Sequence, residues 1–231
     1  YALDSRFTGK SSAFKVTYEG KTYQFETRLA GRFNIYNTLG AIGAALSEGI
    51  SMETIAAAMK TFHSVPGRFE LIDEGQSFTV VVDYAHTPDG LEKILTTAQE
   101  ITKGRILVVF GCGGDRDKMK RPIMGRIAAR YADVAIVTSD NPRTEDPETI
   151  VKEVAAGVEE VKAEKPSLQV EVVVDRRSAI QKAISLAKGD DIVLIAGKGH
   201  EDYQILKDKT IHFDDREEAR KALKESGAAR F

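Results

Sequence analysis

Residues 105–139 read RILVVFGCGGDRDKMKRPIMGRIAARYADVAIVTS. Two continuous apolar runs, residues 105–111 (RILVVFG) and 133–139 (DVAIVTS), flank a stretch in which apolar residues recur at helical spacing, PIMGRIAARYA at residues 122–132. Apolar runs without polar alternation are typical of strands that are buried on both faces. The segment therefore predicts a β–α–β unit, and with it a parallel sheet covered by helices.

The same alternation continues on both sides of this segment. Further apolar runs occur at residues 78–84, 168–174 and 191–197, and helical patterns occur at residues 88–101, 147–163, 177–188 and 214–225. Several helix starts carry capping signals, namely Thr87-Pro88, Asp146-Pro147, and Asp214 with Glu217 as an analogue of a capping box. We predict an α/β fold for residues 66–231, with a mainly parallel sheet and helices on both faces.

Residues 1–65 have a different pattern. Two alternating runs around Glu19-Gly20 predict a β-hairpin. A helix is predicted over residues 34–49, ending at Gly49, and a second, shorter helix after Ser51. The Pro66-Gly67 pair reads as a linker, so we place a domain boundary between residues 65 and 66.

Composition limits the function classes. The 231 residues carry a formal net charge of −2, and the 33 basic residues are spread along the chain, so nucleic-acid binding is not indicated. There is no apolar run of membrane-spanning length and no secretory signal pattern, so we expect no membrane insertion. Cys112 is the only cysteine, which favours a reducing, cytoplasmic setting. The chain starts at Tyr1 without an initiator methionine, and we expect it to be a piece of a longer protein.

Ligands of open parallel sheets bind beyond the carboxyl ends of the strands. Four polar, glycine-rich or charged loops leave those ends: DYAHTPDG (residues 83–90), GCGGDRDKMKRP (111–122), TSDNPRTEDP (138–147) and AGKGHEDYQ (196–204). Because the topology brings these loops to one edge, we predict the functional site there.

The loop GCGGDRDK has two open interpretations. Gly111, Gly113 and Gly114 would let backbone N–H groups approach an anion, or they simply form a tight turn. It is not a dinucleotide fingerprint, because Arg116 stands where the third glycine belongs. The stretch TGKSS (residues 8–12) is not a P-loop either, since Asp4 occupies the position of the first glycine.

Arg143 does not fit a purely structural loop. Asp146-Pro147 is a good helix start, but no turn requires a guanidinium directly after an apolar strand. His86 stands before a helix N-terminus, where it would contact a phosphate or serve as a structural hydrogen-bonding residue. His200 is ambiguous, because its neighbours Glu201 and Asp202 could pair with Lys198.

Other polar residues have ordinary explanations. His63 and His212 look structural, and the four histidines show no metal-ligand spacing. Asn34 could cap a helix. Arg68 could be an exposed charge of the linker.

Taken together, the motifs resemble the Mur ligases, ATP-dependent amide-forming enzymes of peptidoglycan precursor synthesis. They are GRFNIYNTLGA (residues 31–41), VPGRFE (65–70), DYAHTPD (83–89), GCGGDRDK (111–118), DNPR (140–143) and GKGHED (197–202). The chain resembles the members that add meso-diaminopimelate to UDP-MurNAc-L-Ala-D-Glu, and DNPR marks diaminopimelate rather than L-lysine as the amino acid. The resemblance implies that residues 66–231 are the Rossmann-like C-terminal domain and that residues 1–65 are the end of the central ATPase domain.

The resemblance also implies site residues and cofactors. For the amino acid these are Arg116, Asp140, Asn141, Arg143, Gly197 and Glu201. For ATP they are Asn34, Arg68, Asp83 and His86, the first three toward base and ribose and His86 toward the phosphates. The cofactors are ATP and Mg²⁺, whose protein ligands and P-loop are expected upstream, outside this chain. No catalytic residue is assigned, and we expect a monomer.

Three alternatives remain. The chain could belong to a lysine-adding relative or to a folylpolyglutamate-type ligase, although the combination of GCGGDRDK with DNPR argues against both. It could also be a substrate-binding module without activity of its own. We expect the isolated chain to be inactive, because it lacks the P-loop.

Overall fold

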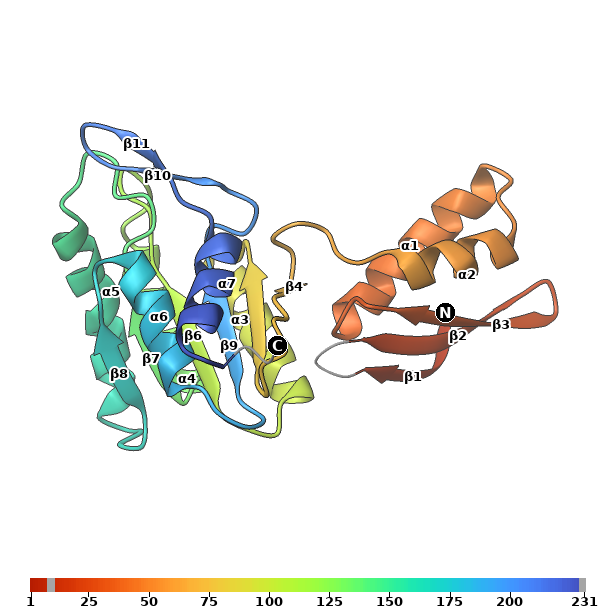
Figure 1. Ribbon diagram of the computed structural model, residues 1–231, viewed down its shortest axis with the longest axis horizontal. Helices are drawn as coiled ribbons and strands as arrows, with labels where there is room; N and C mark the ends of the chain where they lie inside the picture. Colours follow the sequence, from red (N-terminus) through yellow and green to blue (C-terminus); the bar gives the residue numbers. More distant parts are fainter. Residues whose placement is uncertain (8–10, 229–231) are drawn as a thin grey trace. The chain divides into compact units, whose positions relative to one another are not determined.

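The computed structural model describes residues 1–7 and 11–228. The chain forms two compact units, Tyr1–Val65 and Pro66–Phe231, which are described separately here (Figure 1). Residues 8–10 of the TGKSS stretch lie outside the described residues.

The first unit packs two helices on a small antiparallel sheet. The sheet has the order β1 (Ala2–Phe7), β2 (Ser12–Tyr18), β3 (Lys21–Thr27), and the helices are α1 (Arg32–Ser47) and α2 (Met52–Thr61). The expected hairpin is formed by β2 and β3, with Tyr18 paired to Lys21. Its two turn residues, Glu19 and Gly20, both have positive φ, as a two-residue hairpin turn requires.

Both predicted helix signals of this unit are confirmed. The N–H groups of Gly49 and Ile50 donate to the carbonyls of Leu46 and Ala45, which closes α1 as the glycine predicts. The Ser51 hydroxyl accepts a hydrogen bond from the Thr54 N–H and caps α2. Strand β1 was not predicted, because it alternates weakly and contains a bulge between Leu3 and Arg6.

The second unit contains a six-stranded sheet in the order β4-β5-β9-β6-β7-β8. Its strands are β4 (Glu70–Leu71), β5 (Thr79–Asp83), β6 (Ile106–Phe110), β7 (Val134–Val137), β8 (Gln169–Val172) and β9 (Ile192–Ala196). All neighbouring pairs are parallel except β4 and β5. The predicted mostly parallel sheet is confirmed, and the short strand β4 adds an antiparallel edge that was not predicted.

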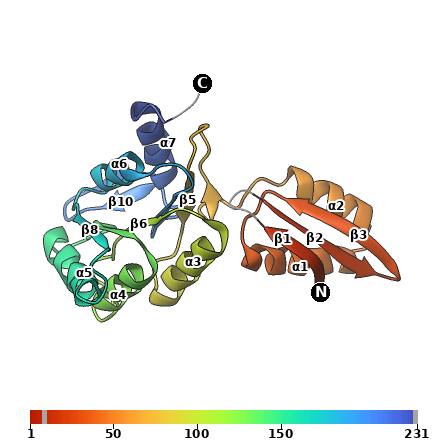
Figure 2. The ribbon, with the colours of Figure 1, turned by 90° about the horizontal axis from the view of Figure 1, so that it is seen from below.

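Helices cover both faces of this sheet, as predicted. They are α3 (Pro88–Ile101), α4 (Lys120–Tyr131), α5 (Pro147–Lys162), α6 (Arg176–Leu186) and α7 (Asp215–Glu225). Helices α3, α4 and α5 lie on one side, and α6 and α7 on the other (Figure 2). Strands β6, β7 and β9 are buried over their whole length, which explains their continuous apolar sequences.

The caps at Thr87 and Asp146 form as expected, each accepting a backbone N–H hydrogen bond from the first turn of its helix. Asp214 caps α7, but the Glu217 side chain does not complete a capping box. Its carboxylate instead contacts Nε2 of His212 at 2.7 Å. His212 thus forms a surface contact with the first turn of α7, in line with its interpretation as a structural residue.

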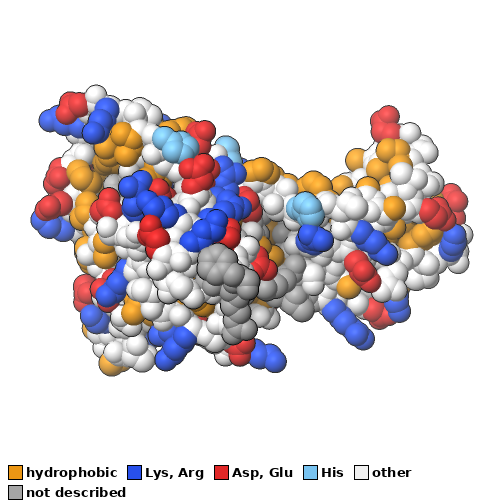
Figure 3. Space-filling model, in the orientation of Figure 1, with side chains coloured by type: hydrophobic (Ala, Val, Ile, Leu, Met, Phe, Trp, Pro, Cys, Tyr) orange, Lys and Arg blue, Asp and Glu red, His pale blue; other side chains and the backbone are white. Residues whose placement is uncertain are grey.

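A second small hairpin, β10 (Tyr203–Ile205) with β11 (Thr210–His212), lies over the carboxyl ends of the parallel strands (Figure 1). Its strands are too short and too polar to be read from the sequence. Cationic and anionic side chains are interspersed on the face shown in Figure 3, in keeping with the small net charge. None of the helices in the described part of the chain is both long and apolar enough to cross a membrane.

Candidate functional site

The four polar loops meet at one edge of the sheet. They leave β5, β9, β6 and β7, which are consecutive in the sheet order, so the topology places the loops side by side. The hairpin β10–β11 is tied to them, because the Arg143 N–H donates to the Ile205 carbonyl at 3.1 Å. A hollow of about 450 Å³ lies between Pro142 and residues 144–147 on one side and residues 206–207 on the other.

The DNPR loop is fastened to the glycine loop by a set of short contacts. The Gly114 N–H donates to the Asn141 carbonyl at 2.9 Å, and the Asp115 N–H donates to Glu145 Oε1 at 2.6 Å. The Asp115 carboxylate in turn accepts from the N–H and the hydroxyl of Thr144. The N–H groups of Gly114 and Asp115 are thus engaged by protein acceptors, and the glycine loop packs against its neighbour.

The glycines of that loop are required by this close approach. A Cβ on Gly114 would lie 1.9 Å from the Pro142 carbonyl oxygen, and one on Gly113 would lie 2.7 Å from Arg143 Nη1. A Cβ on Gly111 would lie 2.2 Å from the backbone carbonyl oxygen of Thr138. This packing agrees with the tight-turn interpretation of the glycines, because atoms of residues 138–143 occupy the space where their side chains would lie.

Arg143 is held by its backbone and by one side-chain nitrogen. Its φ of 53° is in the left-handed region, and its Nη1 donates to the carbonyls of Gly114 at 2.9 Å and Asn141 at 3.4 Å. Within the described residues, Nε and Nη2 make no hydrogen bond, and the side chain is half-buried. The guanidinium is thus fixed on one side and open on the other, which suits bidentate binding of a carboxylate.

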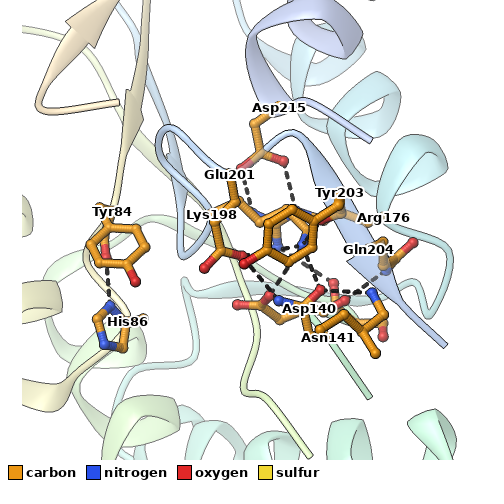
Figure 4. A network of polar contacts seen from close by, with 12 residues as sticks. Tyr84, His86, Asp140, Asn141, Arg176, Lys198, Glu201, Tyr203, Gln204 and Asp215 are labelled. Atoms are coloured by element: carbon orange, nitrogen blue, oxygen red, sulfur yellow. Dashed lines mark hydrogen bonds and ion pairs between the residues drawn. The ribbon is translucent and has the colours of Figure 1, made fainter. Parts of the chain in front are cut away.

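Next to Arg143 lies a buried network around Lys198 (Figure 4). The Lys198 ammonium donates to Asn141 Oδ1 at 2.8 Å and to the Tyr203 carbonyl at 2.7 Å. It lies 3.5 Å from Asp140 Oδ1 and 3.8 Å from Glu201 Oε2. Burial lowers the pKa of Lys198, and the two carboxylates oppose that shift.

Asn141 and Gly197 occupy fixed places in this network. Asn141 Nδ2 donates to Glu201 Oε2 at 3.0 Å, so both ends of the amide are engaged. Gly197 has a φ of 125°, and a Cβ there would lie 2.9 Å from Asp140 Oδ2. Of the six residues expected for the amino acid, the structure therefore gathers Asp140, Asn141, Gly197 and Glu201, with Arg143 following in the same loop as the first two.

Arg116, the sixth, is exposed. Its Nη1 donates to the carbonyl of its neighbour Asp115 at 3.0 Å. The side chain lies on the loop that packs against Arg143, but it joins no network with the other five among the residues described.

The sequence interpretation missed two buried arginines. Arg176 is fully buried and forms a bidentate pair with Asp215, with both N–O distances 2.7 Å. It also donates to the carbonyl of Ala196, the last residue of β9, and to that of Ser139, two residues beyond β7. The available signal was its position at the start of α6, after the loop that leaves the carboxyl end of β8, a fifth such loop that was not considered.

Arg121 is the other one. It is fully buried and binds Glu145 and Glu153, at 2.8 and 2.6 Å, so it supports the DNPR loop from helix α4. Its partners lie 24 and 32 residues away in the chain, so nothing in the local pattern indicated the cluster. Arg121, together with the Asp115 N–H and Lys118, lowers the pKa of Glu145 to about 2.

The residues expected for ATP divide between the two units. Asn34 is buried in the first unit, where Nδ2 donates to the Ala30 carbonyl and Oδ1 accepts from Asn37. Arg68, Asp83 and His86 belong to the second unit. Asp83 accepts from the N–H groups of Phe69 and Ala85, and burial raises its pKa.

Arg68 and His86 lie around the ring of Tyr84. The Arg68 guanidinium carbon is 4.4 Å from the ring centroid. The centroid of the His86 ring is 4.6 Å from that of Tyr84 (Figure 4). His86 Nδ1 donates to the Tyr84 carbonyl at 2.8 Å, and the ring is exposed. His200 also contacts Tyr84, with 5.0 Å between the ring centroids. The cluster thus brings together residues from three segments of the chain, 65–70, 83–90 and 196–204.

A mostly parallel sheet whose polar loops gather at its carboxyl edge defines a ligand-binding α/β domain. Residues 67–199 match the family model described as Mur ligase, glutamate ligase domain, and the chain belongs to the Mur ligase family.

Similar proteins agree with this assignment. The chain is 52% identical, over 92% of its length, to UDP-N-acetylmuramoyl-L-alanyl-D-glutamate–2,6-diaminopimelate ligase of Clostridium botulinum, and 51% identical, over 96%, to the protein of the same name from Geobacillus kaustophilus. It spans 43% and 44% of these relatives. A solved structure of a ligase with the same name has a TM-score of 0.74 and 36% identity, and covers 98% of this chain and 45% of its own.

Proposed function

We propose that this chain is the amino-acid-binding part of an ATP-dependent ligase that adds meso-diaminopimelate to UDP-MurNAc-L-Ala-D-Glu. The observation that carries the proposal is the placement of Arg143. Nη1 of its guanidinium donates to the backbone of the glycine loop, while Nε and Nη2 make no hydrogen bond among the described residues. The guanidinium lies beside a network rich in carboxylates. The names of the similar proteins from Clostridium botulinum and Geobacillus kaustophilus support the same substrates.

The charge balance of the site fits an amino-acid end group. The buried network contains two cations, Lys198 and Arg176, and three carboxylates, Asp140, Glu201 and Asp215. The difference is one uncompensated negative charge, which favours binding of an ammonium group. Arg143 supplies a positive fork next to it. An ammonium and a carboxylate on one carbon, as at each end of diaminopimelate, would complement both.

Lysine lacks the carboxylate at the distal end. Bound in the same way, it would leave the open side of Arg143 without an anionic partner. A site that is built to pair a polar group rejects an analogue lacking that group strongly, because the protein group stays unpaired. We therefore expect selection for diaminopimelate.

The second unit also carries groups that fit part of an ATP site. Arg68 and His86 are exposed and both lie against the Tyr84 ring. The three residues together offer positive charge, a hydrogen-bonding imidazole and an aromatic face. When bound, ATP would supply the phosphoryl group that activates the carboxylate of the acceptor peptide. The part of this chain is to hold and orient the incoming amino acid.

For Mg²⁺ the chain offers less. Among residues 1–7 and 11–228, no group of three or more His, Cys, Asp or Glu residues is arranged to hold a metal ion. The use of ATP and the single buried cysteine are in keeping with a cytoplasmic reaction.

Arg143→Ala in the complete ligase tests the proposal. Removing the fork should raise the KM for diaminopimelate about 10- to 150-fold, the equivalent of about 1.5–3 kcal/mol for a charged hydrogen-bonded pair. Steady-state kinetics with diaminopimelate and lysine side by side measure the effect. The kcat/KM for diaminopimelate divided by that for lysine should fall, because only diaminopimelate has a distal carboxylate that binds the Arg143 guanidinium.

Arg126→Ala is the matched control. Arg126 also forms an ion pair, with Glu160 at 2.9 Å, but on the outer surface between α4 and α5. This variant should keep the diaminopimelate KM of the parent. If Arg143→Ala behaved like Arg126→Ala, Arg143 would not read the substrate and the proposal would fail.

A further inference from the structure

Lys198 is an unusual residue to find without solvent contact. Its side chain is 0% exposed, and its ammonium is held by two short hydrogen bonds and two nearby carboxylates. A buried lysine is costly unless its charge is paired. The contacts lie entirely among the residues proposed to bind the amino acid and the hairpin strand that covers them.

The contacts of Lys198 fix the orientation of the Asn141 amide. Asn141 Oδ1 accepts two hydrogen bonds, from Lys198 Nζ at 2.8 Å and from the Ile205 N–H at 3.0 Å. Both partners are donors only, so the atom between them must be the amide oxygen. The amide nitrogen is thereby directed to Glu201 Oε2, at 3.0 Å.

The same ammonium separates two carboxylates. Asp140 and Glu201 both face Nζ, from different loops, and Lys198 reduces the repulsion between them. With Asn141 donating to one oxygen of Glu201, the carboxylate is held in a single orientation. Its other oxygen, Oε1, makes no hydrogen bond among the residues that the structure describes.

We propose that Lys198 is a positioning residue for amino-acid selection. It orients Asn141 and, through it, presents Glu201 to the ammonium group of the substrate, without touching the substrate itself. This inference rests on the proposed function and deepens it, because it assigns the specificity of the site to a buried side chain behind the contact residues.

The test uses Lys198→Met in the complete ligase, since methionine is close in length and has no charge. We expect the KM for diaminopimelate to rise about 10- to 100-fold, as for loss of a charged hydrogen bond. The KM values for ATP and for the UDP-linked peptide should change less than twofold. Lys182→Met, which removes a half-exposed lysine on α6, should leave all three unchanged.

A merely structural role would give a different result. It would lower the melting temperature and the amount of active enzyme, and with it kcat, but leave the diaminopimelate KM as in the parent. That outcome would overturn the inference. Lys198→Gln serves as a second variant if Lys198→Met does not fold. Its amide can still donate to Asn141 Oδ1 but carries no charge, so its KM for diaminopimelate should rise above that of the parent. A parent-like KM in this variant, when it is the one that folds, would likewise overturn the inference.

Failure of the proposed function can be distinguished from failure of the inference about Lys198. If the parent enzyme did not use diaminopimelate, the function itself would be wrong. If the parent used diaminopimelate and the folded Lys198 variant kept its KM, only the role of Lys198 would be wrong.

Discussion

At the scale of single residues, three non-glycine positions at or beside the candidate site have left-handed backbone geometry, namely Phe69, Asp115 and Arg143. Asp115 and Arg143 both have a φ of 53°, which costs about 1–2 kcal/mol for a residue with a side chain. Each is held in place by contacts across the two loops. Such strain persists only where the surroundings enforce it, and it is common at functional sites. The strain at Arg143 therefore agrees with a role in binding.

Glu145 makes the site sensitive to acid. Arg121 and other donors lower its pKa from a usual 4.5 to about 2 in the folded chain. The charged carboxylate therefore contributes stability above about pH 4.5, and this contribution is lost as the pH falls toward 2. Glu145→Gln should be less stable than the parent at neutral pH, with the difference shrinking over that range. Thermal unfolding followed between pH 7 and pH 3 measures it.

Glu159→Gln is the matched control on the next helix, α5. Its carboxylate is 58% exposed and 3.9 Å from Lys162, so its removal should change stability by less than about 0.5 kcal/mol at any pH. A Glu145→Gln variant whose stability difference did not depend on pH would contradict the ion-pair account.

At the scale of elements, helices α4 and α5 pack through two glycines. A Cβ on Gly125 would lie 2.2 Å from the Val154 oxygen, and one on Gly157 would lie 2.0 Å from the Pro122 oxygen. The backbones of α4 and α5 therefore pack closely at these two glycines. This close packing allows Arg121 on α4 to form an ion pair with Glu153 on α5. The sequence shows both glycines inside helical patterns but not that they face one another.

Gly157→Ala should destabilise the second unit, because the added methyl meets backbone that cannot move freely. We expect about 1–3 kcal/mol from overpacking, seen as a fall of about 3–10 °C in the melting temperature. Differential scanning calorimetry can assign the transition to one unit or the other.

Gly43→Ala offers the opposite case. Gly43 also lies inside a helix, α1, but a Cβ there would meet no atom within 4 Å. This change should stabilise the first unit by about 0.5–1 kcal/mol through helix propensity alone. Equal effects of the two substitutions would show that the contact at Gly157 is not decisive.

At the scale of the whole molecule, the chain corresponds to only part of its relatives. It spans less than half of the relatives from Clostridium botulinum and Geobacillus kaustophilus, and its sequence contains no P-loop motif. We predict that the 231-residue chain alone forms no tripeptide from ATP, diaminopimelate and UDP-MurNAc-L-Ala-D-Glu. The complete ligase assayed in parallel is the positive control. ATP-dependent product from the chain alone would refute the prediction.

Much of the fold could be read from the sequence. The five parallel strands and five helices of the second unit follow from long apolar runs and helical periodicity, and their caps from single residues such as Asp146. The short strands β1, β4, β10 and β11 could not be read, because a few residues of mixed polarity hold no periodic signal. Their pairing depends on neighbours far along the chain.

The candidate site was only partly accessible in this way. The sequence by itself determined which loops meet, because parallel strands bring all their carboxyl ends to one edge. It also supplied Arg143 as a group with no structural purpose in a turn. The contacts of these groups follow only from the tertiary structure. It shows that the glycines leave space for the DNPR loop, and that Lys198 fixes the Asn141 amide by a hydrogen bond to Oδ1. The reason is physical, since burial and pairing of a charge depend on which distant side chains share its space, and local sequence does not record that.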